Sequence, residues 1–379
     1  MLKMAIRFLI QLNLGLRHLF WKIILRIYGG LMGKNVKIFE GVKMALKNGW
    51  MIVSRSPIED SEAAQFLYEN SSCFFNKEEW FRVLREGLDV SVVAYCLEKD
   101  GRICLVLPGV IFNFGIVKMF YSNIPYGGFV GDFRLIAPSL VDFEKSIRGD
   151  AVHIIRIGRK FDTEIPDLDG YGQEIAFTHL IDLKGLNEEQ LWKGYKSSVR
   201  RAIRKAEKSG VVIHEAANPE EIEALFGLYL ETMRRNEAFH IWTKKMFNAV
   251  YRDLTQRGKA AILLAKLKDE IVAGIILLFS PETTYYFFAA SAKKYLSLCP
   301  NDLLVHYGIC LTIRRGIRYF DLMTSQKGDK ALMDFKEKWG AQKHPFYFYE
   351  KSLTRARPWL WKSAWRLMRP SKFTRTVQC

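Results

Sequence analysis

Apolar and polar positions along the first half of the chain follow two different periods. Runs of strand length alternate with stretches whose apolar residues recur every three to four positions, the spacing of one helix face. Lys99-Asp100-Gly101 separates two apolar runs, and Asp-Gly between such runs predicts a β-hairpin. The expected elements, in chain order, are a strand at 48–56, helices near 59–69 and 77–87, strands at 90–98 and 102–110, a helix near 138–147 and a strand near 151–157.

The second half has longer and more regular periodic segments. Asn187 with Gln190 three residues later is a capping-box arrangement, so a helix is expected to start at 188 and to run to 208, with Gly210 ending it. The other expected elements are a strand at 176–183, a strand at 211–216, helices at 219–238 and 243–257, strands at 260–267, 271–280 and 284–291, a helix at 301–315, a strand at 318–323, a helix at 329–338 and a strand at 345–350.

The two halves repeat one order of elements. In the second half, helices are followed by three consecutive strands, a helix, a strand, a helix and a strand, and the first half contains a shorter version of this order. The repetition lies at the level of the fold and is not visible as sequence identity. We therefore predict an α/β protein of two tandem domains, 48–174 and 175–350, the first abbreviated, each a mixed sheet flanked by helices.

The positive charge of the chain lies at its two ends. The formal net charge is +17, and no acidic residue precedes Glu40 or follows Glu350. Seven bases stand before Glu40 and eight after Glu350, which leaves the body between them close to neutral. A protein whose main task is to bind a polyanion would be expected to carry more excess charge in its body, so the distribution argues against that class.

The basic segment at the start of the chain, 1–47, has the pattern of a helix in a bilayer interface. On a helical wheel the bases of residues 1–28 fall in one half, and the large apolar residues fall on the other side. The longest uncharged run, Phe8 to Leu16, is too short to span a bilayer. We predict contact with an anionic membrane surface; a helix packed on the protein's own core is the alternative.

The basic tail, 351–379, repeats this composition. Trp359, Trp361 and Trp365 lie among bases, and indole favours the headgroup zone of a membrane while each nearby base adds electrostatic attraction. We predict a second membrane contact here, with a solvated tail as the alternative. Two such ends would reinforce each other if both reach the same surface.

The six cysteines and seven histidines form no metal motif. The sequence contains no CxxC pair, no HExxH and no close Cys/His spacing that resembles a zinc site. We expect reduced thiols, no metal, and a cytoplasmic protein that is peripheral at the inner face of the membrane.

Three segments resemble a known superfamily. Residues 188–212, EEQLWKGYKSSVRRAIRKAEKSGVV, look like the signature helix of the Fem-type aminoacyltransferases and related GNAT-type acyltransferases. The block PNDLLVHYGICLTIRRGIRYFDLMTS, followed by DFKEKWGA, is similar to a later part of the same proteins. SNIPYGGFV resembles the tyrosine-glycine-glycine loop of their first domain. Because the three occur in the right order, the chain is identified as a member of this superfamily.

The resemblance implies two GNAT-like domains with a cleft between them. Fem-type members transfer an amino acid from aminoacyl-tRNA to an amine of a peptidoglycan precursor, whereas GNAT-type relatives use acyl-CoA, often on amino sugars of polysaccharide pathways. The chain departs from ordinary GNAT domains at 291–302 (SAKKYLSLCPND), where their phosphate-binding loop carries glycine and this sequence has none. Both donors, acyl-CoA and aminoacyl-tRNA, therefore stay open.

Two residues are candidates for the chemistry of acyl transfer. Phe335-Lys336 matches the family's Phe-Lys pair at the substrate channel, so the resemblance assigns Lys336 to a phosphate or to the tetrahedral oxyanion. Asp321 follows Tyr319-Phe320 near the end of an expected strand and is a candidate proton acceptor. The alternatives are an exposed helix lysine and a loop or N-cap carboxylate.

Aromatic and glycine residues are candidates for substrate binding. Tyr126, Gly127 and Gly128 form a loop whose backbone is expected to approach a ligand, with a plain turn as the alternative. Tyr285 and Tyr286 alternate on a strand, so one is expected to face the core and the other, taken as Tyr286, to face the cleft.

The helix expected at 188–208 carries many bases opposed after Gln190 by Glu207 alone. A solvated helix face usually alternates charge signs, so this run indicates a polyphosphate or tRNA surface, and a plain basic face is the alternative. Its candidate binding residues are Lys196, Arg200, Arg201 and Arg204.

The combined interpretation is an N-acyltransferase. We predict transfer of an acyl group to an amine of an amino sugar or cell-envelope precursor, linked to a nucleotide or a lipid, at the cytoplasmic face of the membrane. The alternatives are an aminoacyl-tRNA-dependent peptidoglycan aminoacyltransferase and an inactive GNAT-like scaffold that binds anionic lipid or glycan. In the active protein, Lys336 and at least one of Arg200, Arg201 and Arg204 are expected to line one cavity between the domains.

Overall fold

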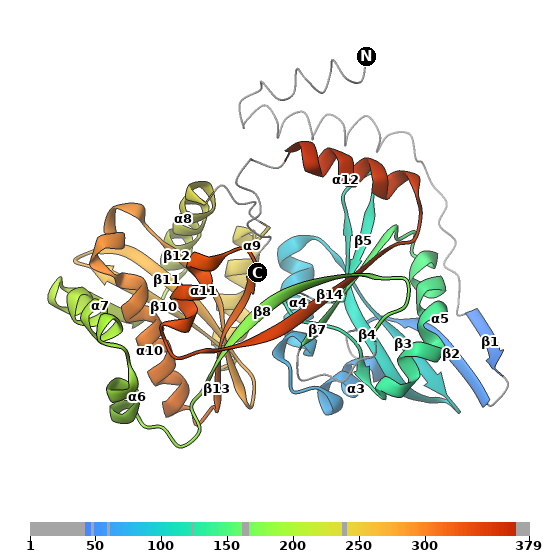
Figure 1. The fold of residues 1–379 in the computed structure, drawn as a ribbon, viewed down its shortest axis with the longest axis horizontal. Coiled ribbons are helices and arrows are strands. Elements are labelled where there is room, and N and C mark those ends of the chain that lie inside the picture. Colours follow the sequence, from blue (N-terminus) through green and yellow to red (C-terminus); the bar gives the residue numbers. More distant parts are fainter. Residues whose placement is uncertain are drawn as a thin grey trace, which may run out of the picture.

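In a computed structural model, the chain forms two lobes that share one sheet (Figure 1). The structure describes residues 42–46, 49–58, 61–122, 124–160, 167–236 and 241–368. The amphipathic helix predicted in residues 1–28 and the end of the predicted tail, 369–379, lie outside the described residues. The prediction that both charged ends meet one membrane plane therefore stays a prediction.

The first half places helices on both faces of its strands. Residues of the strand at 91–99 alternate between two cores. Val93 and Tyr95 pack in the core that includes the helix at 136–149, and Ala94 and Cys96 pack in the core that includes the helices at 62–70 and 78–88. The elements are β1 (Val42–Leu46), β2 (Gly49–Ser56), α3 (Glu62–Asn70), α4 (Glu78–Leu88), β3 (Ser91–Lys99), β4 (Arg102–Asn113), β5 (Lys118–Tyr121), β6 (Val130–Gly131), α5 (Ile136–Gly149) and β7 (Ile154–Lys160).

The second half contains the strands and helices that the periodicity predicts, most with ends shifted by a few residues. The capping box is confirmed, since Asn187 Oδ1 accepts from the Gln190 amide and Gln190 Oε1 accepts from the Asn187 amide. The elements are β8 (Gly172–Asp182), α6 (Glu188–Gly194), α7 (Ser197–Lys208), β9 (Val211–Glu215), α8 (Pro219–Arg235), α9 (Lys244–Ala249), β10 (Ala260–Leu267), β11 (Glu270–Phe279), β12 (Thr283–Ser291), α10 (Pro300–Arg314), β13 (Tyr319–Gln326), α11 (Lys330–Glu337), β14 (Gln342–Ser352) and α12 (Ala356–Met368).

The helix predicted at 188–208 is wrong as a single element. It breaks into α6 and α7 at Tyr195, which is extended and buried. The guanidinium of Arg200 reaches back and donates to the carbonyls of Trp192, Lys193 and Tyr195, at 3.4, 3.1 and 2.6 Å. These bonds add to the capping of the last carbonyls of α6, which stabilises the break.

Each half arranges its strands in the same way. The sheet order is β1-β2-β3-β4-β5-β7-β14-β8-β13-β12-β11-β10-β9, and β6 pairs with β4. From β2 to β5 and from β9 to β12 the neighbours are antiparallel, and each series ends on a parallel pair, β5 with β7 and β12 with β13. Two helices precede the three antiparallel strands and one helix precedes the parallel strand in both halves, as the tandem α/β prediction requires.

Two strands change places where the halves meet. β14, the last strand, pairs with β7 of the first half, whereas β8, which follows β7 in the chain, pairs with β13 of the second half. β8 and β14 also pair with each other from Gly172 to Leu180, so the sheet continues through the seam (Figure 1). The boundary predicted between residues 174 and 175 falls inside β8.

The halves also share a side-chain core. Trp80 from α4 packs edge-to-face against Phe287 from β12, with ring centroids 5.0 Å apart, and Phe75 lies 4.8 Å from the Tyr285 ring. Trp80 is fully buried, and its indole N–H donates to the Ile124 carbonyl at 2.7 Å. Aromatic pairs of this kind stabilise by about 0.5–1.5 kcal/mol beyond the area that they bury. The two lobes therefore behave as one packed body.

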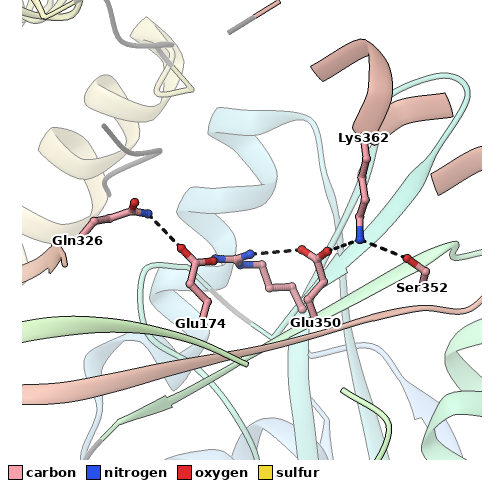
Figure 2. A network of polar contacts seen from close by, with 6 residues as sticks. Glu174, Gln326, Glu350, Ser352 and Lys362 are labelled. Carbon is pink, nitrogen blue, oxygen red and sulfur yellow. Dashed lines mark hydrogen bonds and ion pairs between the residues drawn. The ribbon is translucent and has the colours of Figure 1, made fainter. Parts of the chain in front are cut away.

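A chain of polar contacts joins four strands and α12 at the seam. Figure 2 shows it running from Gln326 through Glu174 and Glu350 to Lys362. The guanidinium of Arg156 on β7 connects the middle members, donating to Glu174 at 2.9 Å and to Glu350 at 3.2 Å. Because Arg156 is largely buried, this cross-link is less screened by solvent than an exposed ion pair.

Substitution of two glycines, one in each half, tests how closely other atoms pack around them. A Cβ on Gly109 in β4 would lie against the Tyr121 carbonyl oxygen and the Phe120 ring, whereas one on Gly227 in α8 would meet no atom within 4 Å. We expect Gly109→Ala to lower the free energy of unfolding by about 1–3 kcal/mol. Gly227→Ala should raise it by about 0.5–1 kcal/mol, because alanine favours a helix interior.

Urea unfolding at constant m-value measures both changes. Equal stability of Gly109→Ala and the parent chain would contradict the packing described for β4 and β5.

Candidate active site

A bulge in β13 forms the centre of the site. Asp321 pairs with Leu180 and Thr324 pairs with Thr178, so Leu322 and Met323 together oppose one residue of β8. Met323 has a φ of 65°, in the left-handed region that non-glycine residues rarely adopt. Such a bulge turns backbone groups out of the regular ladder, where they can bond to side chains.

Three polar groups converge on the carboxylate of Asp321 beneath the bulge. Oδ1 accepts from the Thr178 hydroxyl at 2.6 Å, the Tyr126 hydroxyl at 3.2 Å and the Met323 amide at 2.7 Å. The hydroxyls of Tyr126 and Thr178 also lie 2.7 Å apart. All of these side chains are buried, and burial together with the nearby Asp321 raises the pKa of Tyr126 well above its usual value. Tyr126 therefore acts as a hydrogen-bond donor.

Lys336 of α11 points its amine at the same bulge. Nζ donates to the carbonyl of Met323 at 3.0 Å and to that of Thr324 at 2.7 Å, and the side chain is 4% exposed. Burial lowers its pKa from 10.5 to about 7, although the charges of Asp321 and Asp329 oppose the shift. The alternative of an exposed helix lysine is therefore wrong, and both protonation states of this amine are populated near neutral pH.

His179 on β8 lies directly opposite the bulge. It is completely buried, and burial followed by the charge of Lys336 lowers its pKa to about 4. The imidazole is thus neutral at pH 7. Lys336, whose pKa is about 7, therefore changes its charge in the physiological range, whereas His179 does not.

A pocket of about 470 Å³ opens beside this network, between the halves. The first half contributes the end of α3, including Asn70, and the loop with Tyr126 and Gly127; the second half contributes Tyr285 and Glu282. Tyr126 belongs both to the pocket wall and to the hydrogen bonds on Asp321. Tyr126 therefore links the pocket wall to the network around Asp321.

The predicted basic residues of α7 lie on the other face of the sheet. Val199 and Ile203 anchor α7 in the second-half core, whereas Met323 and Tyr126 belong to the core shared by the halves. Lys196 and Arg201 are exposed, Arg204 lies 5.4 Å from the Trp192 ring, and Arg200 caps α6. Neither these residues nor Lys336 line the described pocket, so the expected shared cavity is not this one.

The remaining candidates have packing contacts. Phe335 is partly buried against the second-half core, with the Lys338 amine 4.3 Å from its ring. Tyr286 packs 6.2 Å from Phe320 on the face of that same core, and burial raises its pKa. Gly128 has a φ of 128°, which a side chain would strain.

Sequence reasoning missed Thr178, His179 and the bulge at Met323. Thr178-His179 interrupts the apolar run from Ile175 to Ile181 with two buried polar side chains, a signal that a buried polar site often leaves. The bulge left no signal, because it depends on pairing with β8, more than a hundred residues earlier.

Metal ligands and disulfides do not add to the site. Within residues 42–368, gaps excepted, no group of three His, Cys, Asp or Glu side chains is placed to hold a metal ion. The five cysteines in the described ranges are free thiols.

Comparison with known proteins identifies the second half. A family model described as an acetyltransferase (GNAT) domain matches residues 193–337, a stretch that includes Asp321 and Lys336. The second half of this chain contains a GNAT-type acetyltransferase domain. No curated protein sequence gives a significant match. Tyr126 and Thr178 lie outside the matched domain, so the first half and the seam complete the network around Asp321.

Solved structures support a Fem-like tandem fold. FemX has 15% identity and a TM-score of 0.57, covering 82% of this chain and 99% of its own. A tandem GNAT protein from the clavulanic acid biosynthesis pathway has 11% identity and a TM-score of 0.57, covering 81% and 99%. L-PGS from Bacillus licheniformis has 15% identity and a TM-score of 0.53, covering 83% and 98%. At these identities the likeness concerns the fold alone.

The buried amine of Lys336 gives the protein a pH-dependent stability. Between pH 7 and 10.5 the unfolded chain keeps this proton and the folded chain releases it, so the free energy of unfolding rises with pH by up to about 1.4 kcal/mol per unit. Below pH 7 both states hold the proton, and the full cost of burying the charge remains. We expect Lys336→Met to lack this dependence.

Urea unfolding of the parent chain and Lys336→Met at pH 7 and pH 9 checks this expectation. Other titrating groups cancel in the difference between the two proteins. The free energy of unfolding of the parent should rise relative to that of the variant between pH 7 and pH 9. An equal difference between the two proteins at both pH values would contradict a depressed pKa of Lys336.

Proposed function

We propose that the protein is an N-acyltransferase that acylates an amine of an amino sugar or cell-envelope precursor. The proposal rests chiefly on Lys336, which lies inside the matched GNAT domain and buries a near-neutral amine against the bulge of β13. A pocket shared by both halves and adjacent to the same hydrogen-bond network gives an acceptor a place to bind. The acceptor that we favour is a nucleotide- or lipid-linked saccharide precursor.

Lys336 has the donors and the proton affinity that the reaction requires. The acyl donor supplies an activated carbonyl; when the acceptor amine attacks it, an oxyanion develops and the amine must lose a proton. A protonated Lys336 has three N–H groups, of which Met323 and Thr324 use two. The third is left for the oxyanion, and the neutral form can take the proton.

Acyl-CoA is the donor that the GNAT domain favours, because GNAT domains generally use it. The residues before α10 offer little for its phosphates: Lys294 is paired with Glu270 at 2.7 Å, and Asp302 at the start of the helix is bonded to Lys338. Aminoacyl-tRNA is the second candidate, and the exposed bases of α7, Lys196 and Arg201 among them, favour it. An inactive scaffold is the third reading.

Donor choice is tested with the full chain, acetyl-CoA and a set of amine acceptors, by following release of the CoA thiol. We expect thiol release that requires both protein and amine. Transfer from charged tRNA without CoA turnover would replace the first proposal by the second. Failure with both donors would favour the scaffold.

Lys336→Met should lower turnover by about 10²-fold or more, since general acid–base and oxyanion groups each contribute on this scale. Lys330→Met, an exposed lysine on the same helix, is the matched control and should keep parental turnover. Circular dichroism and urea unfolding report whether each variant is folded. Parental activity in folded Lys336→Met would remove this residue from the reaction.

We further propose that the protein works as a peripheral protein at the inner face of the membrane, held in part by α12. No helix in the described part of the chain is long and apolar enough to cross a bilayer. On α12, Trp359 and Leu360 are 67% and 47% exposed, while Trp361 is stacked on Phe114 with ring centroids 4.8 Å apart. The helix contains three bases and no acid, which suits an anionic surface.

The two tryptophans should behave differently in vesicle binding. Trp359→Ala should weaken binding to mixed phosphatidylcholine and phosphatidylglycerol vesicles by about tenfold, the size expected for losing one buried large side chain. Tyr68→Ala removes an aromatic ring that is 70% exposed on α3 and should have no effect. Co-sedimentation at rising salt should show weaker binding. Equal binding by Trp359→Ala and the parent would exclude this contact.

A further inference from the structure

A buried histidine at the start of α12 lies between two hydrogen-bond donors. His153, just before β7, is 8% exposed and sits between β5 and the first turn of α12. The backbone amide of Lys118 donates to its Nδ1 at 3.1 Å, and a guanidinium nitrogen of Arg357 lies 3.1 Å from its Nε2. Both ring nitrogens of His153 therefore face N–H groups.

A neutral imidazole cannot accept at both nitrogens, because one of them carries the proton. The position of Lys118 is set by the backbone, since its carbonyl also accepts from the His153 amide at 2.8 Å. The hydrogen bonds thus assign Nδ1 as the acceptor and Nε2 as the N–H. This buried N–H faces the guanidinium of Arg357, which can only donate, and within the described ranges no oxygen is bonded to it.

The charge at this place is positive and is not neutralised by a carboxylate. Arg357 forms no ion pair in the part of the chain that the structure describes. Asp150, three residues before His153, directs its carboxylate elsewhere and accepts from Arg55 at 2.7 Å and from Tyr95 at 2.6 Å. Burial, followed by the charge of Arg357, lowers the pKa of His153, so the ring is neutral at pH 7.

The helix itself adds to the attraction for an anion. α12 begins at Ala356 and has no acidic residue in its first turn. The amides of a first turn lack helical acceptors and give the helix start a partial positive charge. Helix side chains lean toward the N-terminus, so the guanidinium of Arg357 belongs to this end. A helix start, a guanidinium and a buried imidazole N–H thus meet at one place.

We propose that His153 and Arg357 bind a phosphate group, one of whose oxygens accepts from both Nε2–H and the guanidinium. The two nitrogens are 3.1 Å apart, close enough to share one oxygen at ordinary hydrogen-bond length. Phosphate supplies the missing acceptor, the negative charge, and further oxygens for a second guanidinium N–H.

This site goes beyond the proposed function and does not depend on it. Both residues lie outside the matched GNAT domain, and neither lines the pocket between the halves. Two sources of phosphate have this chemistry: a lipid headgroup and a small soluble phosphate. Trp359 and Leu360, exposed on the same helix, favour the lipid, because they place the site beside the surface proposed to meet the membrane.

NMR of the full chain with isotope-labelled histidine tests the site with inorganic phosphate, at an ionic strength held constant with chloride. The signal of His153 is the one missing from His153→Gln or, if that variant does not fold, the ring signal moved by Arg357→Gln. Phosphate should shift the Nε2 signal to saturation and raise the pKa of His153, because a bound negative charge favours the protonated ring.

Two matched variants locate the binding. Arg357→Gln should weaken phosphate binding about tenfold or more, the scale of a hydrogen bond to a charged group. Arg355→Gln removes the same charge from an exposed position two residues earlier and should change binding by less than about twofold. Both positions are exposed, so neither substitution should disturb the fold.

Co-sedimentation with mixed phosphatidylcholine and phosphatidylglycerol vesicles separates the two sources. If a lipid headgroup occupies the site, Arg357→Gln should lose about tenfold more vesicle binding than Arg355→Gln. Equal losses on vesicles, with inorganic phosphate still bound in the NMR titration, would assign the site to a soluble phosphate.

The proposal is overturned if neither inorganic phosphate nor vesicles move the Nε2 signal of His153, or if Arg357→Gln and Arg355→Gln behave alike in both assays. It is also overturned if the Nε2 signal is that of an unprotonated nitrogen, since Arg357 would then have its acceptor. A bound phosphate in a protein that transfers no acyl group would reject the proposed function and leave this site in place.

Discussion

Backbone pairing between β8 and β14 is the interaction on which the rest of the structure depends. These strands exchange places between the halves, and their ladder turns two α/β units into one sheet. The exchange fixes β13 against β8, which creates the bulge at Met323 and brings Thr178 beneath it. It also holds the loop with Tyr126 over the second half, so that the two units build a site neither contains alone.

Asp321 and Lys336 at this seam are stabilised by the hydrogen bonds that they make. An uncompensated buried carboxylate or amine costs several kcal/mol. Asp321 receives bonds from a tyrosine, a threonine and an amide, and Lys336 places its amine on two carbonyls. The remaining cost for Lys336 appears as a depressed pKa, which is also what makes the amine useful at neutral pH.

Local sequence patterns predicted most elements. The apolar residues of strands and helices recur with different periods, and the capping box of α6 involves residues only three positions apart. The resemblance proposes Lys336 as a site residue, and the structure buries its amine against the β13 bulge; its role in the reaction stays a prediction. What local patterns could not reveal depends on distant contacts. The sequence predicts that Tyr126 belongs to a ligand-binding loop. In the structure its hydroxyl donates to Asp321, 195 residues later in the chain. The break at Tyr195 depends on Arg200 reaching back, and the basic face of α7 gives no hint that the sheet separates it from the bulge.

The late position of β14 in the chain affects how the protein is made. While it is being synthesised, the first half emerges with β7 as an open sheet edge, because its neighbour β14 follows the other strands of the second half in the chain. Open edges of this kind pair readily with other chains. The nascent protein therefore needs either rapid completion or a chaperone to cover that edge, and a chain truncated before β14 would expose two strands, β7 and β8, at once.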